Sequence, residues 1–497
     1  MPGPIKVDDI VVLIPGIMGS VLTGPDGSDV WAPSVDAVLN ALLTGGGDIQ
    51  KLQLAGPCNQ PNSDGITATR LFPDVHLIPG FWTIDGYTKI DQNLRQYLGI
   101  TLGQNYYQFP YDWRQDNRVA AKQLLDQSQQ WLAAWRNPSS NPSAPHPAHP
   151  NAKLIIIAHS MGGLIARYFI ECLGGWKNTR MLITFGTPFH GSVKALQYLV
   201  NGYKVAAGPF TIADLSPIIR SFPAAYQLLP EYPCIETGGA KPARIADLQA
   251  TLPQQLDPLC LSDAIKFYSE MADAVAANKQ VPGYKYDIHA MVGTEQVTEL
   301  RGAIANGAFT GYNDYPPEDW QGDTTVPWNS AHPVDNGTFE FGTYYPEVHG
   351  SIQNGDDVLQ NVRNLIDALN PPPWVTTFRA AAASTLNRVL GRPSTSAPAS
   401  SAPAGQNWIA VQMSEVYIGQ SVGIDARVAG DSPAFADVTD VKTGVMIHQH
   451  LALQPGPGGV QNVTLDGLPQ GIYRIRLFAS DAGVRSITNL FTVLTPP

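Results

Sequence analysis

The sequence predicts an α/β protein with a mostly parallel sheet covered by helices, followed by a small all-β domain. Two observations predict the first part. Strand and helix patterns alternate between residues 7 and 369, and the apolar run at 154–157 leads through a turn into a helical pattern at 163–173. A third observation predicts the second part, because short strand patterns separated by Gly, Pro and Asp turns fill the last 90 or so residues.

Length and charge narrow the function classes. A chain of 497 residues exceeds what one hydrophobic core usually serves, so two or three domains are expected. The net charge of −11 and the scarcity of Lys/Arg runs argue against a nucleic-acid partner, since phosphate contacts need clustered basic side chains. The sequence shows neither a Sec signal nor an apolar run of membrane-spanning length. This predicts a cytoplasmic protein by default and leaves export by another route open.

The four cysteines do not predict a metal centre. They are widely spaced, without a Cys-x-x-Cys pair or histidines at zinc-like intervals, and we expect neither a metal nor a cofactor. Cys234 and Cys260 flank one polar, proline-rich stretch and could pair in an oxidising compartment. A disulfide and two free thiols both stay open for these residues, whereas Cys172 is expected to be a buried thiol.

The first strand pattern runs from Val7 to Ile14 and ends in a turn of small residues at 15–20. In an open parallel sheet, ligands bind at that end of the strands. Helical patterns follow at 84–98 and 117–135, and a Pro/Ser/His-rich surface loop at 137–151 leads to the next strand.

A second buried strand pattern at 181–185 precedes a long region without regular alternation. An insertion at 193–286 in an α/β core predicts a lid or cap. The core patterns then resume as strands at 289–293 and 338–341 and helices at 356–369 and 377–390. The first domain is therefore predicted to span residues 1–391.

The C-terminal region differs in composition. Residues 392–406 are dominated by Pro, Ser, Ala and Thr, which cannot bury enough surface to fold, and they are interpreted as a linker. Residues 407–497 have the size and strand spacing of an immunoglobulin-like β-sandwich. His448 and His450 would share one side of a strand, but without a third ligand they are interpreted as surface residues.

Ser160 is the candidate nucleophile. It lies at the apex of a strand, a sharp turn and a helix in the segment Ala158–Gly162, where small residues two before and two after the serine allow a strained elbow to close. The alternative interpretation is a serine that caps the following helix. Ala158 stands where the usual pattern has Gly, which adds only one methyl group.

A serine nucleophile needs a base and an acid, and on an elbow of this type they follow it in the order acid, then histidine. Asp323 lies in a turn-forming context downstream, where the alternative role is an Asx-turn. His349 lies between a strand and a helix, as a base on a loop should. His332 is a weaker candidate because it is nine residues beyond Asp323 and follows no new strand. His159 adjoins the serine, but its side chain is expected to point elsewhere.

The oxyanion that forms at an attacked carbonyl needs fixed N–H donors. The backbone amide of Met161, directly after the nucleophile, is one candidate. The loop after the first strand supplies the other at Ile17–Met18.

Six segments, taken together and in this order, resemble the lecithin:cholesterol acyltransferase-like α/β-hydrolases, a family that includes lysosomal phospholipase A2 and bacterial relatives. No single segment is specific, but the ordered set spans about residues 11–369. The segments are Ile14–Ser20, Phe109–Arg114, Ala158–Gly163, Phe185–Pro188, Gly322–Pro327 and Val348–Gly350.

The resemblance implies a triad of Ser160, Asp323 and His349, with Met18 and Met161 as oxyanion donors and a lid over an acyl pocket. It also marks Phe109–Arg114 as a signature loop beside the site, which we interpret as scaffold in preference to substrate contact. Two departures from the family pattern, Ala158 and Thr324 after the acid, remove no catalytic group.

The sequence therefore predicts a serine esterase or lipase that acts on lipid esters through an acyl-enzyme, as a phospholipase or an acyltransferase. The expected partners are a lipid or other ester substrate and, through the lid, a membrane surface in transient contact. One alternative is an esterase of small non-lipid esters. Another is a non-catalytic scaffold or effector in which the C-terminal sandwich binds a protein partner that the sequence does not identify.

Overall fold

The structure is a computed structural model. It describes residues 4–369 and 409–494 except for 33–49, 59–60, 62, 74–85, 138–145, 208–209, 240, 315–320, 334–341, 414–415, 418–421, 429–432, 441–442, 444, 456–460, 470 and 481–486. The predicted strand at 338–341, the helix at 377–390 and the linker at 392–406 lie outside the described residues. The chain divides into two compact units, whose main parts are residues 4–363 and 364–497.

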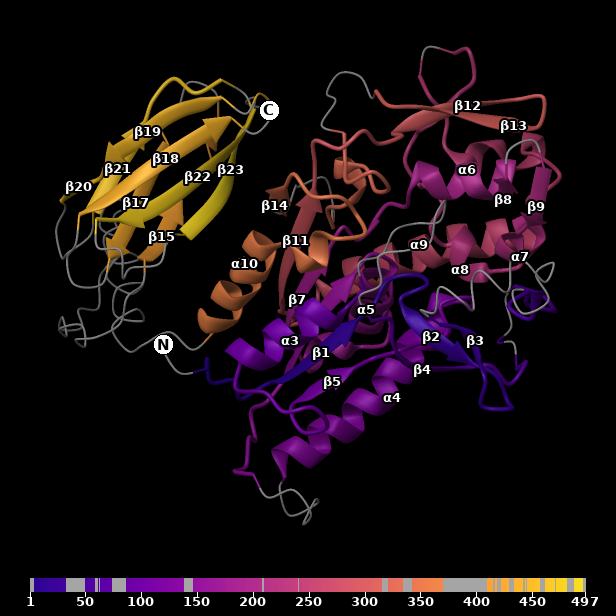
Figure 1. The fold of residues 1–497 in the computed structure, drawn as a ribbon, viewed down its shortest axis with the longest axis horizontal. Coiled ribbons are helices and arrows are strands. Elements are labelled where there is room, and N and C mark those ends of the chain that lie inside the picture. The colour runs from indigo at the N-terminus through magenta and orange to yellow at the C-terminus, as the bar shows by residue number, and fades with distance from the viewer. Residues whose placement is uncertain are drawn as a thin grey trace. The chain divides into compact units, whose positions relative to one another are not determined.

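A parallel six-stranded sheet forms the centre of the first unit (Figure 1). Its strands, in spatial order, are β14 (Gly342–Tyr345), β11 (Asp287–Gly293), β7 (Thr179–Phe185), β6 (Leu154–His159), β1 (Ile10–Ile14) and β5 (Tyr106–Gln108). Every residue of β1 and β6 is buried. Such continuous apolar strands are typical of a parallel sheet whose two faces are both covered. The predicted α/β fold is confirmed.

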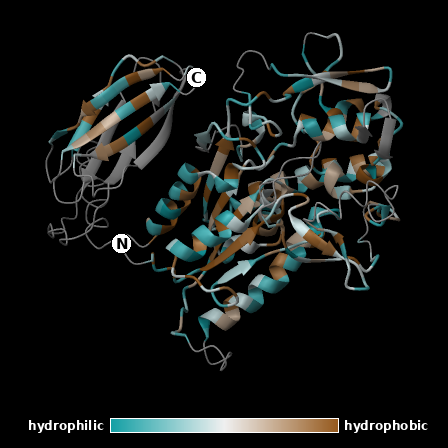
Figure 2. Cartoon of the chain, in the orientation of Figure 1, coloured by the Kyte–Doolittle hydropathy of each residue, from teal (hydrophilic) through white to brown (hydrophobic). Residues whose placement is uncertain are grey.

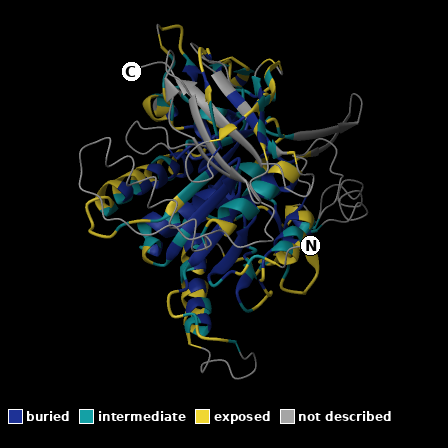
Figure 3. Cartoon of the chain, turned by 90° about the vertical axis from the view of Figure 1, so that its left-hand side faces the viewer, coloured by how far each residue is buried: buried dark blue, intermediate teal, exposed yellow. Residues whose placement is uncertain are grey.

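Helices surround this sheet, and its strands form the hydrophobic and buried interior in Figures 2 and 3. The helices are α3 (Thr88–Tyr97), α4 (Asn117–Arg136), α5 (Met161–Cys172), α9 (Pro258–Asn278) and α10 (Asp356–Asp367). Helix α4 begins where Asp116 accepts a hydrogen bond from the backbone N–H of Arg118, and Asp257 caps α9 in the same way. Helices α4 and α9 both pack against α5, the helix that follows Ser160.

The region predicted as a lid contains two different parts. Its first part holds α6 (Val193–Asn201), the hairpin of β8 (Lys204–Ala207) and β9 (Phe210–Asp214), α7 (Ser216–Arg220) and α8 (Pro223–Tyr226). Its second part ends in α9, a 21-residue helix that packs against α5 of the core. Helix α9 therefore lies against the core, and the lid or cap at 193–286 stays a prediction.

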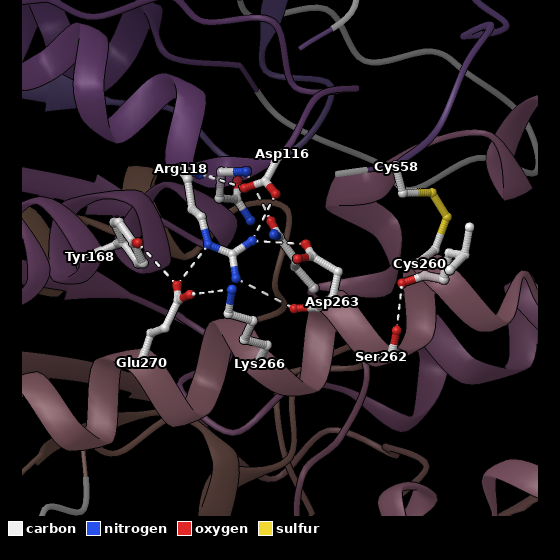
Figure 4. Close-up of polar contacts among 12 residues, drawn as sticks. Cys58, Asp116, Arg118, Tyr168, Cys260, Ser262, Asp263, Lys266 and Glu270 are labelled. Atoms are coloured by element: carbon white, nitrogen blue, oxygen red, sulfur yellow. Dashed lines mark hydrogen bonds and ion pairs between the residues drawn. A yellow bond between two sulfur atoms is a disulfide. The ribbon is translucent and has the colours of Figure 1, made fainter. Parts of the chain in front are cut away.

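Two side-chain connections fasten α9 (Figure 4). Arg118 of α4 donates to the carboxylates of Asp263 and Glu270 on α9, at 2.8 Å each, and Tyr168 of α5 donates to Glu270 at 3.0 Å. Near the start of α9, Cys260 forms a disulfide with Cys58.

The disulfide corrects the expectation for the cysteines. Cys260 has Cys58 as its partner, 202 residues away, with a Cα–Cα distance of 5.2 Å, and Cys234 is a free, buried thiol. Cys172 is only partly exposed. Burial of its thiol, and to a smaller extent the negative charge of Glu270, raise the pKa of Cys172 to about 12.

Two small three-stranded sheets complete the first unit. The first has the strand order β3 (Asp29–Trp31), β2 (Ser20–Thr23), β4 (Thr67–Leu71). The second contains β10 (Ile235–Glu236), β12 (Arg301–Ala305) and β13 (Ala308–Tyr312), of which β12 and β13 are antiparallel. Among the residues that the structure describes, no helix is long and apolar enough to cross a membrane.

The second unit contains two β-sheets, which agrees with the predicted β-sandwich. One has the order β15-β17-β21-β20 and the other β16-β23-β22-β18-β19, with alternating burial along β18. His450 on β19 is exposed and has a positive φ of 51°, so the alternation along this strand is broken there. The strands are β15 (Ile409–Met413), β16 (Val416–Tyr417), β17 (Val422–Val428), β18 (Ala434–Asp440), β19 (Met446–Ala452), β20 (Gln454–Pro455), β21 (Gln461–Leu465), β22 (Gly471–Ala479) and β23 (Ile487–Leu494).

Candidate active site

Ser160 occupies a strained turn between β6 and α5. Its φ of 52° and ψ of −127° are rare for a residue with a side chain, and such strain is found mostly at functional sites. The turn closes because Gly162 has no side chain, since a Cβ there would lie 2.3 Å from the carbonyl oxygen of Pro15. Ala158 is completely buried in β6, so the methyl group that departs from the usual pattern fits into the core.

The structure brings Ser160, His349 and Asp323 together as a hydrogen-bonded cluster. His349 Nε2 lies 2.8 Å from Ser160 Oγ, and His349 Nδ1 lies 2.7 Å from Asp323 Oδ2. All three residues are buried. An ionised carboxylate can only accept, so His349 Nδ1 carries the proton and Nε2 is free to accept from the serine hydroxyl. This arrangement has the geometry in which a histidine deprotonates a serine.

The loop that carries Asp323 is fixed by its own backbone and by hydrogen bonds with Thr298 and with Lys194 of α6. Asp323 Oδ1 accepts from the N–H groups of Thr325 and Val326, which leaves Oδ2 for the histidine. Thr324 has a φ of 81°, a conformation that favours Gly, which is the residue usual at this position of the family pattern. Its N–H donates to Thr298 and its carbonyl accepts from Lys194 Nζ at 3.0 Å, and these bonds hold the strained threonine.

The two other histidine candidates have different positions. His332 is fully buried and shares a hydrogen bond with the hydroxyl of Tyr344, so the structure does not bring it to the serine. The Nε2 of His159 lies 2.9 Å from the backbone carbonyl of His349 and its Nδ1 lies 2.8 Å from the hydroxyl of Tyr87, so both nitrogens have partners other than Ser160. The two imidazole rings have centroids 5.1 Å apart. The packing of His159 under the loop of His349 depends on tertiary contacts and could not be predicted from the pentapeptide.

The turn after β1, Pro15–Ser20, approaches the elbow; we name it the oxyanion turn after the role that the sequence predicts for it. The N–H of Gly19 bonds the carbonyl of Gly16 at 3.1 Å, and Met18 within this turn has a positive φ of 62°. The orientation of the peptide group between Ile17 and Met18 depends on this unusual φ. Met161 begins α5, so its N–H has no intrahelical acceptor and is available to a ligand.

Aromatic side chains hold the backbone of the oxyanion turn. Trp31 Nε1 donates to the carbonyl of Met18 at 3.0 Å, and the hydroxyl of Tyr111 donates to the carbonyl of Pro15 at 3.0 Å. Trp113 Nε1 donates to the backbone carbonyl of Ser20 at 3.1 Å, and the N–H of Gly16 donates to the hydroxyl of Tyr87 at 2.7 Å. Tyr111 and Trp113 belong to the predicted signature loop. The contacts of Trp31 and Tyr87 could not be predicted from the sequence, because no local pattern connects these residues with the turn.

Arg114, the last residue of the signature loop, is completely buried. Its guanidinium donates to Asp112 and Asp64, and to the backbone carbonyl of Leu52. These bonds satisfy a charge that would otherwise be costly to bury. The arginine thereby fixes the segment around Leu52 against the signature loop.

An apolar cavity of about 80 Å³ adjoins the oxyanion turn. Ile17 and Met18 of the turn form part of its wall, together with Trp31 and Trp113. The segment 195–228, which is the first part of the predicted cap, and the segment around Leu52 supply the other lining residues. They are Leu52, Ala195, Tyr198, Leu199, Tyr203, Leu215, Ile218, Ile219, Phe222, Ala225 and Leu228.

The residues that the structure describes give no support for a metal centre. Cys58, Asp257 and Cys260 come close enough to share an ion, but both sulfur atoms are joined in the disulfide. Thiolates are the metal-binding form of cysteine, so this group is not a ligand set.

A parallel sheet with a serine elbow after β6 and an acid and a histidine after later strands defines the α/β-hydrolase fold. The family model described as "Lecithin:cholesterol acyltransferase" matches residues 63–250, a range that includes Ser160 and the signature loop. The match confirms the resemblance seen in the sequence motifs and supports an ester hydrolase or acyltransferase. A comparison with curated proteins finds no match.

Among solved structures, the chain is similar to the Tle4–Tli4 complex with 15% identity, 74% of this chain and 99% of that chain covered, and a TM-score of 0.48. It is similar to the mature lipase BlEst2 of Bacillus licheniformis with 14% identity, coverage of 74% and 94%, and a TM-score of 0.29. It is also similar to the phospholipase PlaB of Legionella pneumophila with 9% identity, coverage of 83% and 88%, and a TM-score of 0.27.

Proposed function

We propose that the protein is a serine-dependent hydrolase or acyltransferase of lipid esters that works through an acyl-enzyme on Ser160. The hydrogen-bonded cluster of Ser160, His349 and Asp323 carries this proposal. The family match over residues 63–250 supports the same class of reaction.

In the first half of the reaction, His349 Nε2 takes the proton of Ser160 while Oγ attacks the ester carbonyl. The backbone N–H groups of Met18 and Met161 stabilise the negative charge on the carbonyl oxygen. The carbon–oxygen bond to the alcohol then breaks, and the leaving alkoxide takes the proton from His349. Asp323 keeps the proton on His349 Nδ1 before the attack and stabilises the imidazolium that forms.

In the second half, water or an acceptor alcohol gives its proton to His349 Nε2 and attacks the acyl-enzyme. Breakdown of the second tetrahedral intermediate returns the proton to Ser160 and releases the acid or the new ester. The acceptor decides between hydrolysis and acyl transfer, and both outcomes use the same residues.

The cavity supports an acyl chain as the group that Ser160 receives. Its lining is formed by aliphatic and aromatic side chains and carries no charged residue. Burial of a hydrocarbon chain in such a site is favourable by about 0.8 kcal/mol for each CH₂ group. Contact of the cap with a lipid surface stays a prediction.

A comparison of soluble and aggregated esters tests the proposal. We expect hydrolysis of p-nitrophenyl esters to become more efficient from acetate to octanoate, and acyl release from phosphatidylcholine vesicles. Ser160→Ala should lower both activities by about 10⁴-fold or more, while Ser262→Ala, an exposed serine on α9, should leave them unchanged. Hydrolysis of the acetate without acyl release from vesicles would favour the alternative of a non-lipid esterase. Full activity of Ser160→Ala would contradict the mechanism.

A further inference from the structure

A buried chain of hydrogen bonds connects the oxyanion turn to the backbone of His349. The N–H of Gly16 lies 2.7 Å from Tyr87 Oη, which lies 2.8 Å from His159 Nδ1. His159 Nε2 in turn lies 2.9 Å from the carbonyl oxygen of His349. Tyr87 and His159 are each about 1% exposed, so water does not compete for these bonds.

The direction of every bond in the chain follows from its two ends. The carbonyl of His349 can only accept, so His159 Nε2 carries a proton and donates it. The neutral ring then has a free lone pair on Nδ1, which accepts the hydroxyl proton of Tyr87. The hydroxyl oxygen of Tyr87 accepts from the N–H of Gly16. One tautomer of His159 therefore satisfies all the polar groups of the chain.

His159 has no part in moving protons during the reaction. Burial, with a smaller contribution from His349, lowers the pKa of His159 to about 3, so the ring stays neutral at ordinary pH. Both of its nitrogens are already occupied by Tyr87 and by the backbone. A ring with these properties is suited to hold two segments at a fixed distance.

We propose that Tyr87 and His159 are positioning residues that set the oxyanion turn and the loop of His349 relative to Ser160. The inference rests on the proposed function, because it assigns the pair to the same site. Gly16 is directly beside the elbow, since a Cβ on it would lie 2.8 Å from Ser160 Cβ and 3.1 Å from His159 Nδ1. Tyr87 and His159 thus connect the N–H of Gly16, next to Ile17–Met18, with the backbone carbonyl of His349.

A role in positioning differs measurably from a role in general stability. A loosened oxyanion turn and a displaced His349 raise the free energy of the transition state, whereas most side chains that line the cavity lie outside this turn, so ground-state binding changes little. Loss of one link should therefore lower kcat and leave KM nearly unchanged. Loss of both links should cost no more than loss of one, because the links act in series.

The test uses the full chain and the hydrolysis of p-nitrophenyl butyrate. Tyr87→Phe and His159→Phe should each lower kcat by about 10- to 100-fold with KM changed less than about twofold. The double variant should be no slower than His159→Phe. His159→Gln, whose amide can donate to the carbonyl of His349 and accept from Tyr87, should recover most of the lost kcat.

Tyr106→Phe is the matched control, because this buried tyrosine also loses a hydroxyl hydrogen bond, here to Asp91 at 2.8 Å, away from the site. It should retain the kcat of the parent protein. If Tyr87→Phe and His159→Phe have the kcat of the control, or multiply their effects in the double variant, the inference is wrong. If His159→Phe does not fold, Tyr87→Phe alone decides. Activity of Ser160→Ala in the same assay would instead show that the proposed function has failed.

Discussion

The two sides of the site are held by different forces. On the side of Ser160, Met18 and His349, hydrogen bonds to Trp31, Tyr87 and other side chains fix the backbone. On the side of the cavity, the segment 195–228 contributes mostly aliphatic and aromatic side chains. Hydrogen bonds have narrow geometry, whereas apolar packing tolerates substitutions that conserve volume. The hydrogen-bonded side is therefore suited to fix the chemistry and the packed side to adapt to the acyl group.

The largest expected effect comes from removing His349, the proposed base, from the hydrogen-bonded side. His349→Ala should lower kcat for p-nitrophenyl butyrate by about 10⁴-fold or more, because His349 is the proposed base that takes the proton of Ser160. His450→Ala, which removes an exposed histidine of the second unit, should have no effect. Equal kcat values for the two variants would remove the distinction between the two sides.

The next effect concerns the link between the cavity wall and α9. The segment that carries Leu52 ends at Cys58, whose disulfide to Cys260 fixes it to α9. Replacing both cysteines by serine should lower the free energy of unfolding by about 3 kcal/mol, since the disulfide restricts the unfolded chain. Cys172→Ser is the control. A double variant as stable as the control in urea unfolding would contradict this role.

The stability of the hydrogen-bonded side should depend on pH through His159. Its pKa is about 3 in the folded protein and about 6.5 in the unfolded chain, so between these values only the unfolded chain binds the proton. The contribution is complete above pH 6.5 and is lost as the pH falls towards 3. From pH 7 to 4.5 the parent protein should lose about 2 to 3 kcal/mol more stability than His159→Gln in urea unfolding. Equal losses would show that His159 is not buried as a neutral ring.

A smaller effect separates the two roles of Trp31, whose N–H bonds the oxyanion turn and whose ring lines the cavity. Trp31→Phe keeps an aromatic ring and removes the donor. We expect kcat to fall about 10-fold, and the factor should be similar for the acetate and the octanoate ester. Trp176→Phe, on the 3₁₀ turn Gly175–Lys177 after α5, is the control. A loss confined to the octanoate would assign Trp31 to the cavity alone.

The smallest effect is expected on the packed side. Ala225→Phe fills part of the cavity, so kcat/KM should fall about fivefold for the octanoate ester and stay unchanged for the acetate. The ratio between the two esters is the readout, because it does not depend on the amount of active protein. An equal loss for both esters would show that the side chain at 225 affects the chemistry as well.

Sequence patterns predicted the parts of the molecule that depend on local order. The continuous apolar run before Ser160 and the alternation of strands and helices predicted the parallel sheet, which the structure confirms. The order of nucleophile, acid and histidine selected Asp323 and His349, which lie within hydrogen-bond distance in the chain Ser160–His349–Asp323. Their catalytic roles stay proposals.

Contacts between distant segments could not be predicted in this way. Spacing does not determine which cysteines pair, and Cys58 is 202 residues from Cys260. Tyr87 and Trp31 have no neighbours in the sequence that connect them with the oxyanion turn, which they reach only through the fold. The ion pairs of Arg118 that hold α9 against the core also join segments far apart in the sequence, and the lid at 193–286 stays a prediction.

The nucleophilic character of Ser160 is the central claim, and labelling with a fluorophosphonate tests it most directly. The folded full chain should be modified at Ser160, as identified by mass spectrometry of the peptide, and His349→Ala should suppress the reaction. Modification of a different serine, or no modification of the folded protein by a probe small enough to enter the cavity, would contradict the account.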